Sequence, residues 1–341
     1  MPATRPDKLP PIDVGAWVRV GARVQGRADP SKLNDEQMDT VYGELHAGGK
    51  IHKNVGVTLN LNAGGSHGPA GIMDAIIAFD FADPIHLWAG QQLVPVDRSN
   101  FSGPFFMIPW NYPGILSVGA NTVFMLPREG PAGRNTGAVI WGDFGEGAFK
   151  YFVGAFDNGD VKTDPLISGR LNLALIGKEP GLWGNSSYFG DKDVVAIGVG
   201  GQYERKGSTA PAAKPPAVTP DPDTYSEVNA DLLAEFKVGD GGWVTGEAAY
   251  YHFSGANEGI KDSMYILAAY ATPSVGFGNI QPMVRYQMGK GDNQKVWNLD
   301  AYLGYVIKGP ALRATFGVQH VDLDNGLVGN AVQLGAQAIF F

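Results

Sequence analysis

Charged residues recur at even spacings in several segments of this chain, and an even spacing places side chains on one face of a β-strand. Residues 13–25 read DVGAWVRVGARVQ and carry Arg19 and Arg23 four positions apart. Residues 227–237 carry Glu227, Asp231 and Glu235 at the same interval. The chemistry that such faces support is electrostatic, because rows of charge attract and orient ions and dipolar solutes.

Catalytic or metal chemistry has little support in the sequence. A hydrolase needs a nucleophile, a base and an orienting group within hydrogen-bond reach. The six histidines are scattered and none lies in an HExxH motif. Asp322, Asp324 and Asn325 in VDLDNG could hold a calcium ion at a loop tip, but a plain Asx turn is the favoured interpretation. We therefore expect no enzyme, no cofactor and no metal site.

The composition excludes further classes of protein. Cysteine is absent, which rules out disulfides, cysteine-ligated metals and thiol catalysis. The formal net charge is -8 at pH 7, and nucleic-acid binding needs a clustered basic face. We therefore expect no nucleic-acid partner.

The strongest pattern in the sequence is an alternation of apolar and polar residues. In residues 13–25 every even position from 14 to 24 is apolar, whereas the odd positions are largely charged, polar or glycine. This period of two predicts a strand with one apolar and one polar face. Similar segments follow, which gives about sixteen strands in all: 41–51, 55–63, 73–81, 85–93, 137–144, 148–156, 167–176, 194–204, 227–237, 243–253, 262–271, 279–289, 295–306, 310–320 and 330–340.

An even number of strands, each with alternating apolar and polar residues, is typical of a transmembrane antiparallel β-barrel when short turns and longer loops connect the strands alternately. Closure removes the edges that an open sheet of this size would expose. A barrel so wide cannot fill its interior with wall side chains, so the polar face is expected to line an aqueous lumen. Soluble sandwiches, propellers and solenoids are the alternatives, although no internal repeat of the length of a propeller blade is present. The predicted fold class is thus all-β, with residues 1–341 as one barrel.

One long segment, residues 94–135, fits neither a strand nor a helix period. Six prolines interrupt it, yet it contains several aromatic residues, including Phe101, Phe105 and Trp110. An apolar segment of this kind needs a surface to pack on, and we expect it to fold into the lumen as a constriction loop. Its aromatic side chains could stack on permeating solutes, but packing of the loop against the wall is favoured. Its charged residues would narrow the pore: Asp97, Arg98, Arg128, Glu129 and Arg134.

The alternation also assigns charged residues of the wall to the lumen. We expect Arg19, Arg23, Arg285 and Arg313 to become neighbours when the barrel closes, because first and last strands then pair. Lys50 and Arg170 are further basic candidates. The acidic wall, across from the arginines, consists of Glu227, Asp231 and Glu235. Pore width and these charges would set selectivity. The alternative is that they are ordinary solvated residues of a water-filled lumen.

Several segments lie outside the predicted strands. Residues 1–12 form an N-terminal segment that lacks the apolar core of a signal peptide, so the chain is either not exported or has lost a signal. Residues 206–224 form a Pro/Ala-rich loop that is expected on the outside. Residues 177–193 lie on the side of the short turns, and the strand pattern does not explain their length.

The strand count, the loop pattern, the long third loop and the ending QLGAQAIFF resemble the Gram-negative porins. The resemblance implies a bacterial outer-membrane location, surrounding lipid, a homotrimer, and recognition of the last strand by the barrel-assembly machinery. The passage LWAGQQLVPVDRSNFSGPFF resembles the phosphate-selective porin O/P family over about twenty residues, but the chain lacks dense lysine and arginine clusters.

These observations predict a passive diffusion channel for small hydrophilic solutes or ions. Two alternatives stay open. One is a barrel with a closed pore, whose loops serve a structural or docking role. The other, less favoured, is a barrel hydrolase.

Overall fold

The structure is a computed structural model of the chain. It describes residues 13–27, 36–37, 41–62, 71–113, 133–157, 164–206, 224–255, 260–291, 295–323 and 327–340. The predictions for residues 1–12 and for nearly all of 206–224 therefore lie outside the described residues.

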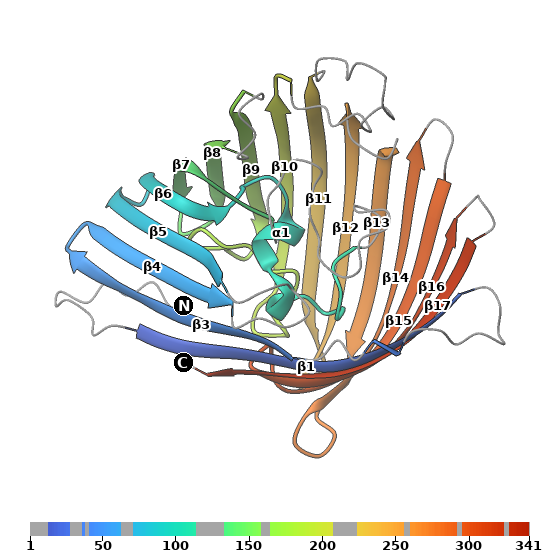
Figure 1. The fold of residues 1–341 in the computed structure, drawn as a ribbon. Helices are drawn as coiled ribbons and strands as arrows, with labels where there is room; N and C mark the ends of the chain where they lie inside the picture. Colours follow the sequence, from blue (N-terminus) through green and yellow to red (C-terminus); the bar gives the residue numbers. More distant parts are fainter. Residues whose placement is uncertain are drawn as a thin grey trace, which may run out of the picture.

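The described strands form one antiparallel sheet (Figure 1), which consists of sixteen long strands and, in addition, the two-residue strand β2. The strands are β1 (Asp13–Arg27), β2 (Glu36–Gln37), β3 (Val41–His52), β4 (Val55–Asn62), β5 (Gly71–Ala82), β6 (Ile85–Leu93), β7 (Arg134–Phe144), β8 (Phe149–Asp157), β9 (Leu166–Ile176), β10 (Val194–Glu204), β11 (Tyr225–Val238), β12 (Gly242–Ser254), β13 (Ile260–Ala271), β14 (Asn279–Gly291), β15 (Lys295–Lys308), β16 (Leu312–Leu323) and β17 (Leu327–Phe340).

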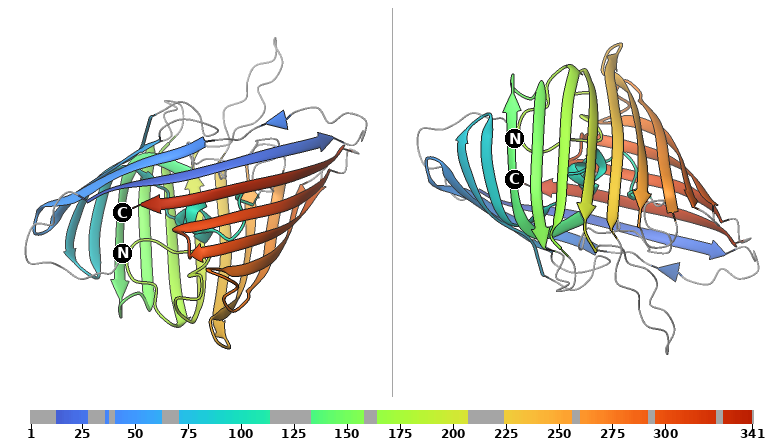
Figure 2. Two further views of the ribbon diagram at one scale, coloured as in Figure 1. Left: turned by 90° about the horizontal axis from the view of Figure 1, so that it is seen from below. Right: turned by 90° about the horizontal axis from the view of Figure 1, so that it is seen from above.

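The sheet closes on itself through β1. On one edge β1 pairs with β17, from Ala16 opposite Phe340 to Arg27 opposite Gly329. On its other edge it pairs with β3. Figure 2 shows β1 and β17 side by side when the barrel is viewed from below. The predicted closed antiparallel barrel of about sixteen strands is confirmed.

The two faces of the wall have opposite chemistry. On β11 the side chains of Glu227, Asp231 and Glu235 are buried, whereas Val228 and Leu232 between them are exposed. The same contrast recurs around the barrel, since large apolar residues are exposed on strand after strand and most buried polar residues come from the opposite positions of the strands. A soluble barrel would show the reverse arrangement. The exterior therefore suits lipid, and the barrel is of the outer-membrane type.

Two segments that connect strands lie inside the ring of strands. The first inner segment, residues 94–113, follows β6 and contains the short helices α1 (Arg98–Ser102) and η1 (Pro104–Phe106); α1 lies within the barrel in Figure 1. The second inner segment, residues 177–193, connects β9 to β10. No helix of the described residues is long and apolar enough to span a membrane.

The largest hydrophobic cluster lies in the lumen. It combines Val96 and Phe101 of the first inner segment with Leu182 of the second and with wall residues such as Phe152 and Tyr251. The apolar core therefore holds the inner segments against the wall.

The two inner segments enter from opposite ends of the barrel. Neighbouring strands from β6 to β9 are all antiparallel, so the end of β6 and the end of β9 point in opposite directions. The predicted loop 94–135 is two residues too long, because β7 begins at Arg134. Residues 114–132 of that loop lie outside the described residues.

Candidate functional site inside the barrel

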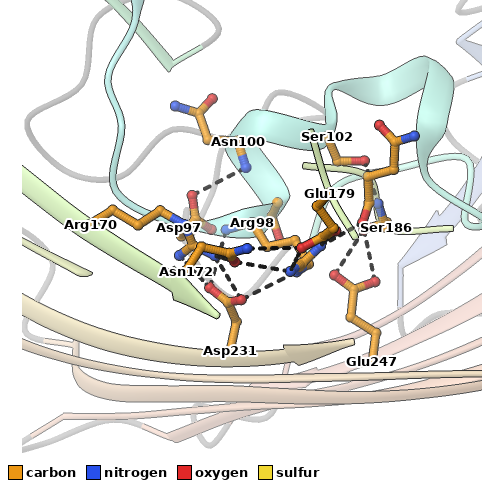
Figure 3. A network of polar contacts seen from close by, with 12 residues as sticks. Asp97, Arg98, Asn100, Ser102, Arg170, Asn172, Glu179, Ser186, Asp231 and Glu247 are labelled. Atoms are coloured by element: carbon orange, nitrogen blue, oxygen red, sulfur yellow. Dashed lines mark hydrogen bonds and ion pairs between the residues drawn. The ribbon is translucent and has the colours of Figure 1, made fainter. Parts of the chain in front are cut away.

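The site is built around Arg98, in the first turn of α1. Asp97 caps this helix: it has extended backbone angles, and its Oδ1 accepts a hydrogen bond of 3.1 Å from the backbone N–H of Asn100. The cap directs the fully buried Arg98 side chain toward the second inner segment and the wall. Figure 3 shows Arg98 between Glu179 and Asp231.

Arg98 is held by carboxylates from two different elements. Its Nη1 and Nη2 donate to the two carboxylate oxygens of Glu179 at 2.7 and 2.9 Å. Its Nε donates to Oδ1 of Asp231 on β11 at 3.3 Å. The fork of Arg98 onto Glu179 is the strong bidentate form of an ion pair.

Arg170 on β9 completes a charge-balanced network with these residues. It donates to both carboxylate oxygens of Asp231, at 2.5 and 2.9 Å, and to the carbonyl oxygen of Val96 at 3.2 Å. Two arginines thus face two carboxylates in a buried place. Loss of one member would leave a buried charge without its partner, which is strongly unfavourable.

The pKa values of two residues in the inner segments reflect this environment. Burial raises the pKa of Asp97 to about 6, although a hydrogen bond from the Tyr251 hydroxyl and the charge of Arg170 act in the opposite direction. Burial also opposes ionisation of Glu179, but the charge and hydrogen bonds of Arg98 hold its pKa well below the ordinary range. Glu179 is therefore a stable anion, whereas Asp97 titrates in the mildly acidic range.

The acidic wall also holds the second inner segment. Ser187 donates from Oγ to Glu235 at 2.7 Å, and the backbone N–H of Gly190 donates to the same carboxylate at 2.8 Å. On β12, Glu247 accepts from Ser186 Oγ at 2.8 Å; both side chains are labelled in Figure 3. Glu227 differs, because it accepts hydrogen bonds from Tyr225 and Asn229 of its own strand.

The basic wall holds the second half of the first inner segment. Arg313 donates to the carbonyl oxygen of Ile108 at 2.9 Å, and Arg19 donates to that of Trp110 at 2.8 Å. Arg285, which forms an ion pair of 2.7 Å with Asp300, also donates to the carbonyls of residues 111 and 112. These three predicted lumen arginines therefore lie on the inner face and bind one continuous stretch of backbone.

Glycines in the wall provide space for this segment. A Cβ at Gly335 would lie 2.4 Å from the ring of Trp110, and a Cβ at Gly21 would lie 3.0 Å from the same ring. The Arg19 guanidinium lies over that ring, 4.0 Å from its centroid. On the other side of the barrel, a Cβ at Gly200 would lie 2.0 Å from the carbonyl oxygen of Val96. The wall can hold the segment closely only because these positions have no side chain.

The remaining predicted residues are placed as follows. Lys50 is half-buried near the turn end of β3. Arg23 lies on β1 opposite Gln333, but its side chain is outside the described part of the chain. Arg128 and Glu129 also lie outside the described residues. Arg134 forms an ion pair of 2.7 Å with Asp74 of β5.

The sequence interpretation missed the second inner segment and, with it, Glu179. One signal was available, because residues 177–193 combine Pro180 and several glycines with Trp183, Tyr188 and Phe189. That composition resembles the first inner segment and differs from a turn.

A metal site has no structural candidate in the described ranges, where no group of three or more His, Asp or Glu side chains is arranged to hold an ion. Asp324 and Asn325 of the possible calcium loop are not among the described residues.

No protein-family model and no curated protein matches the chain, but solved structures match its fold. OprB of Pseudomonas putida, at high pH, has a TM-score of 0.64 and 11% identity, and the match covers 97% of this chain and 94% of OprB. An anion-selective porin from Comamonas acidovorans has a TM-score of 0.60 and 11% identity, over 97% of this chain and 100% of the porin. The trimer form of OmpT from Vibrio cholerae has a TM-score of 0.60 and 10% identity, over 96% of this chain and 99% of OmpT. The chain therefore shares the barrel fold of the outer-membrane porins.

Proposed function

We propose that this outer-membrane barrel is a passive diffusion channel for small hydrophilic solutes or ions. The observation that supports this function is the opposite chemistry of the two faces of the closed wall, with apolar residues outside and polar or charged residues inside. A barrel of this width leaves an interior that its wall side chains alone do not fill.

The two inner segments would form the constriction of this channel. The first crosses the lumen, because its first half is bound to β9 and β11 and its second half to β1, β14 and β16. Charge is polarised along the same direction. Within the described residues, Arg19 on β1 and Arg313 on β16 form no ion pair. On the facing wall, the same is true of Glu227 and Glu235 on β11 and of Glu247 on β12. We propose that the resulting field orients dipolar and charged solutes as they pass.

The test is single-channel conductance of the detergent-purified protein in a planar bilayer, with the reversal potential measured under a salt gradient. We expect stepwise openings. An anion-selective reversal potential would assign control to the arginine wall, and a cation-selective one to the acidic wall. A protein that inserts but gives no openings would refute the channel.

We further propose that the channel is a homotrimer. The OmpT structure in trimer form is similar in fold, and the exposed apolar exterior can contact either lipid or another protomer. Openings in groups of three would support a trimer. Recognition of β17 by the barrel-assembly machinery belongs to the same proposal.

One observation favours a second candidate function, a non-conducting barrel that docks a partner. Side chains of both inner segments are almost fully buried in the lumen, including Phe105 and Ser187 at 0% exposure. A barrel packed in this way could be closed. The conductance measurement separates the two candidates.

A hydrolase remains a less favoured candidate. Residues 64–68 read GGSHG and match the GxSxG pattern, but they lie outside the described residues. In α/β-hydrolases this motif occupies a turn from a strand to a helix, whereas here it lies between the antiparallel strands β4 and β5. Hydrolysis of an ester substrate that is lost in Ser66→Ala would support the hydrolase.

A further inference from the structure

The second inner segment brings an acidic residue, Glu179, into the middle of the barrel from the end opposite the first. It comes from a connection that joins β9 to β10 at the end of the short turns. Glu179 is 1% exposed, and its carboxylate also accepts hydrogen bonds from Tyr188 at 2.8 Å and Asn172 at 2.9 Å. These donors orient the carboxylate toward Arg98.

The contact between the two inner segments extends beyond this ion pair. Arg98 Nη1 also donates to the backbone carbonyl of Asn185 at 3.0 Å, and the backbone N–H of Ser186 donates to Ser102 Oγ at 3.0 Å. The ring of Phe101 meets that of Trp183 edge-on, with centroids 6.4 Å apart. The ion pair is therefore the charged centre of a larger contact that joins segments from the two ends of the barrel.

The second inner segment is itself fixed to the wall near Glu179. Lys150 on β8 donates from Nζ to the carbonyls of Gly181 and Trp183 at 3.1 and 3.0 Å. Asp143 on β7 accepts from the backbone N–H of Gly181 at 2.9 Å. The residues that follow Glu179 are held in this way along the segment, since Glu235 and Glu247 bind Ser187 and Ser186 farther along. These wall contacts do not involve the Glu179 carboxylate, so loss of its charge would weaken the link to the first inner segment while the second stays bound to the wall.

The charges around Arg98 show what Glu179 contributes. Arg98 and Arg170 are matched by Glu179 and Asp231, so the network is neutral. Further charged or titratable groups interact with its members: Lys150, Lys192, Asp97 and Glu247. Without the Glu179 charge, the network carries one excess positive charge in the lumen.

We propose that Glu179 determines the ion selectivity of the channel, by neutralising Arg98 at the constriction and by joining the two inner segments there. This inference rests on the proposed channel function. At a separation of about 7 Å in water, one unit of charge changes the energy of a passing ion by about 0.6 kcal/mol, which corresponds to a factor of about three in permeability.

The experiment measures reversal potentials under a salt gradient for a cycle of charge variants. Glu179→Gln is expected to shift the anion-to-cation permeability ratio about sevenfold toward anions, because the lost charge changes the energies of anions and cations by the same amount in opposite directions. Arg98→Met is expected to shift it toward cations, and the double variant is expected to restore the wild-type ratio. The matched control is Glu146→Gln, because Glu146 lies at the same end of the barrel but is exposed and paired with Lys178.

The outcomes distinguish this inference from the channel itself. A wild-type protein that does not conduct refutes the proposed function. A wild-type channel whose permeability ratio is unchanged by Glu179→Gln refutes the role of Glu179 and leaves the channel standing. If the single variants do not fold, the double variant, in which neither member of the pair is left charged, still decides. We expect it to show higher conductance or more open-channel noise at the wild-type ratio, whereas wild-type conductance and noise would overturn the inference.

Discussion

Asp97 combines two roles that favour different protonation states. As the cap of α1 it accepts a hydrogen bond from a backbone N–H, and its other oxygen accepts one from the Tyr251 hydroxyl at 2.5 Å. Both contacts favour the anion, but burial dominates and raises its pKa to about 6 from 3.8. The folded state therefore binds the proton more tightly than the unfolded chain does. The resulting stabilisation is fully present below about pH 4 and is lost as the pH rises through 6.

We predict that Asp97→Asn removes this contribution to the pH dependence. Asparagine caps a helix as well as aspartate does and cannot titrate. Over pH 4 to 7, urea unfolding in detergent should show the wild-type free energy of unfolding falling by up to about 3 kcal/mol relative to the variant. Arg170, Asp231 and Tyr251, which surround the site, are unchanged in both proteins. If the free energy of unfolding depended on pH equally in the two proteins, the shifted pKa of Asp97 would be contradicted.

At the scale of elements, the wall and the first inner segment fit each other through glycines. The position of Gly335 on β17 is occupied by the ring of Trp110, and Gly21 on the neighbouring β1 borders the same ring. The arginines that bind residues 108–112 lie on β1, β14 and β16. Strands β1, β14, β16 and β17 thus together hold residues 108–112 of the first inner segment.

We predict that Gly335→Val displaces Trp110 and loosens the first inner segment. The nearest ring atom lies 2.4 Å from the position of an added Cβ, so the indole must move. Overpacking of this kind costs about 1–3 kcal/mol in stability, and we expect a broader distribution of single-channel conductance. Gly329→Val on the same strand is the control, because a Cβ there meets no atom within 4 Å. Equal effects of the two substitutions would contradict the fit.

The sequence predicted elements better than it predicted contacts. Period-two alternation located the sixteen long strands, because lipid on one side and the lumen on the other impose opposite chemistry on successive residues. Alternation assigns Arg170 and Asp231 to a face but says nothing of their pairing, which depends on how the barrel closes. The second inner segment was missed for a related reason. Its anchors, such as Glu235 and Glu247, are far from it in sequence, and only the closed barrel brings them together.

For the whole molecule, the exposed apolar exterior is the feature that defines its environment. Leu334 lies near the middle of β17, directly before the inward-facing Gly335, and is 59% exposed. Its cross-strand neighbours on either side, Ala22 and Phe316, are also apolar. A side chain in this position faces lipid or another protomer.

We predict that Leu334→Arg impairs insertion of the barrel. An arginine on the lipid face costs about 2–4 kcal/mol at the middle of the bilayer. The fraction of protein that refolds into lipid vesicles, measured by the shift of the folded band on gels without heating, should fall. Leu334→Ala, which removes apolar area without adding charge, should have a smaller effect. Wild-type refolding of Leu334→Arg would mean that this part of β17 does not lie within the bilayer.

The pairing of β1 with β17 also divides the first inner segment into two halves with different requirements. The groups that hold residues 105–112 include Arg285 on β14, Arg313 on β16 and Gln337 on β17, whose Nε2 donates to the carbonyl of Phe105. Val96 and Arg98 dock instead on β9 and β11, which lie away from the closing pair. Opening of the barrel between β1 and β17 is therefore expected to release residues 105–112 while the contacts of Val96 and Arg98 persist.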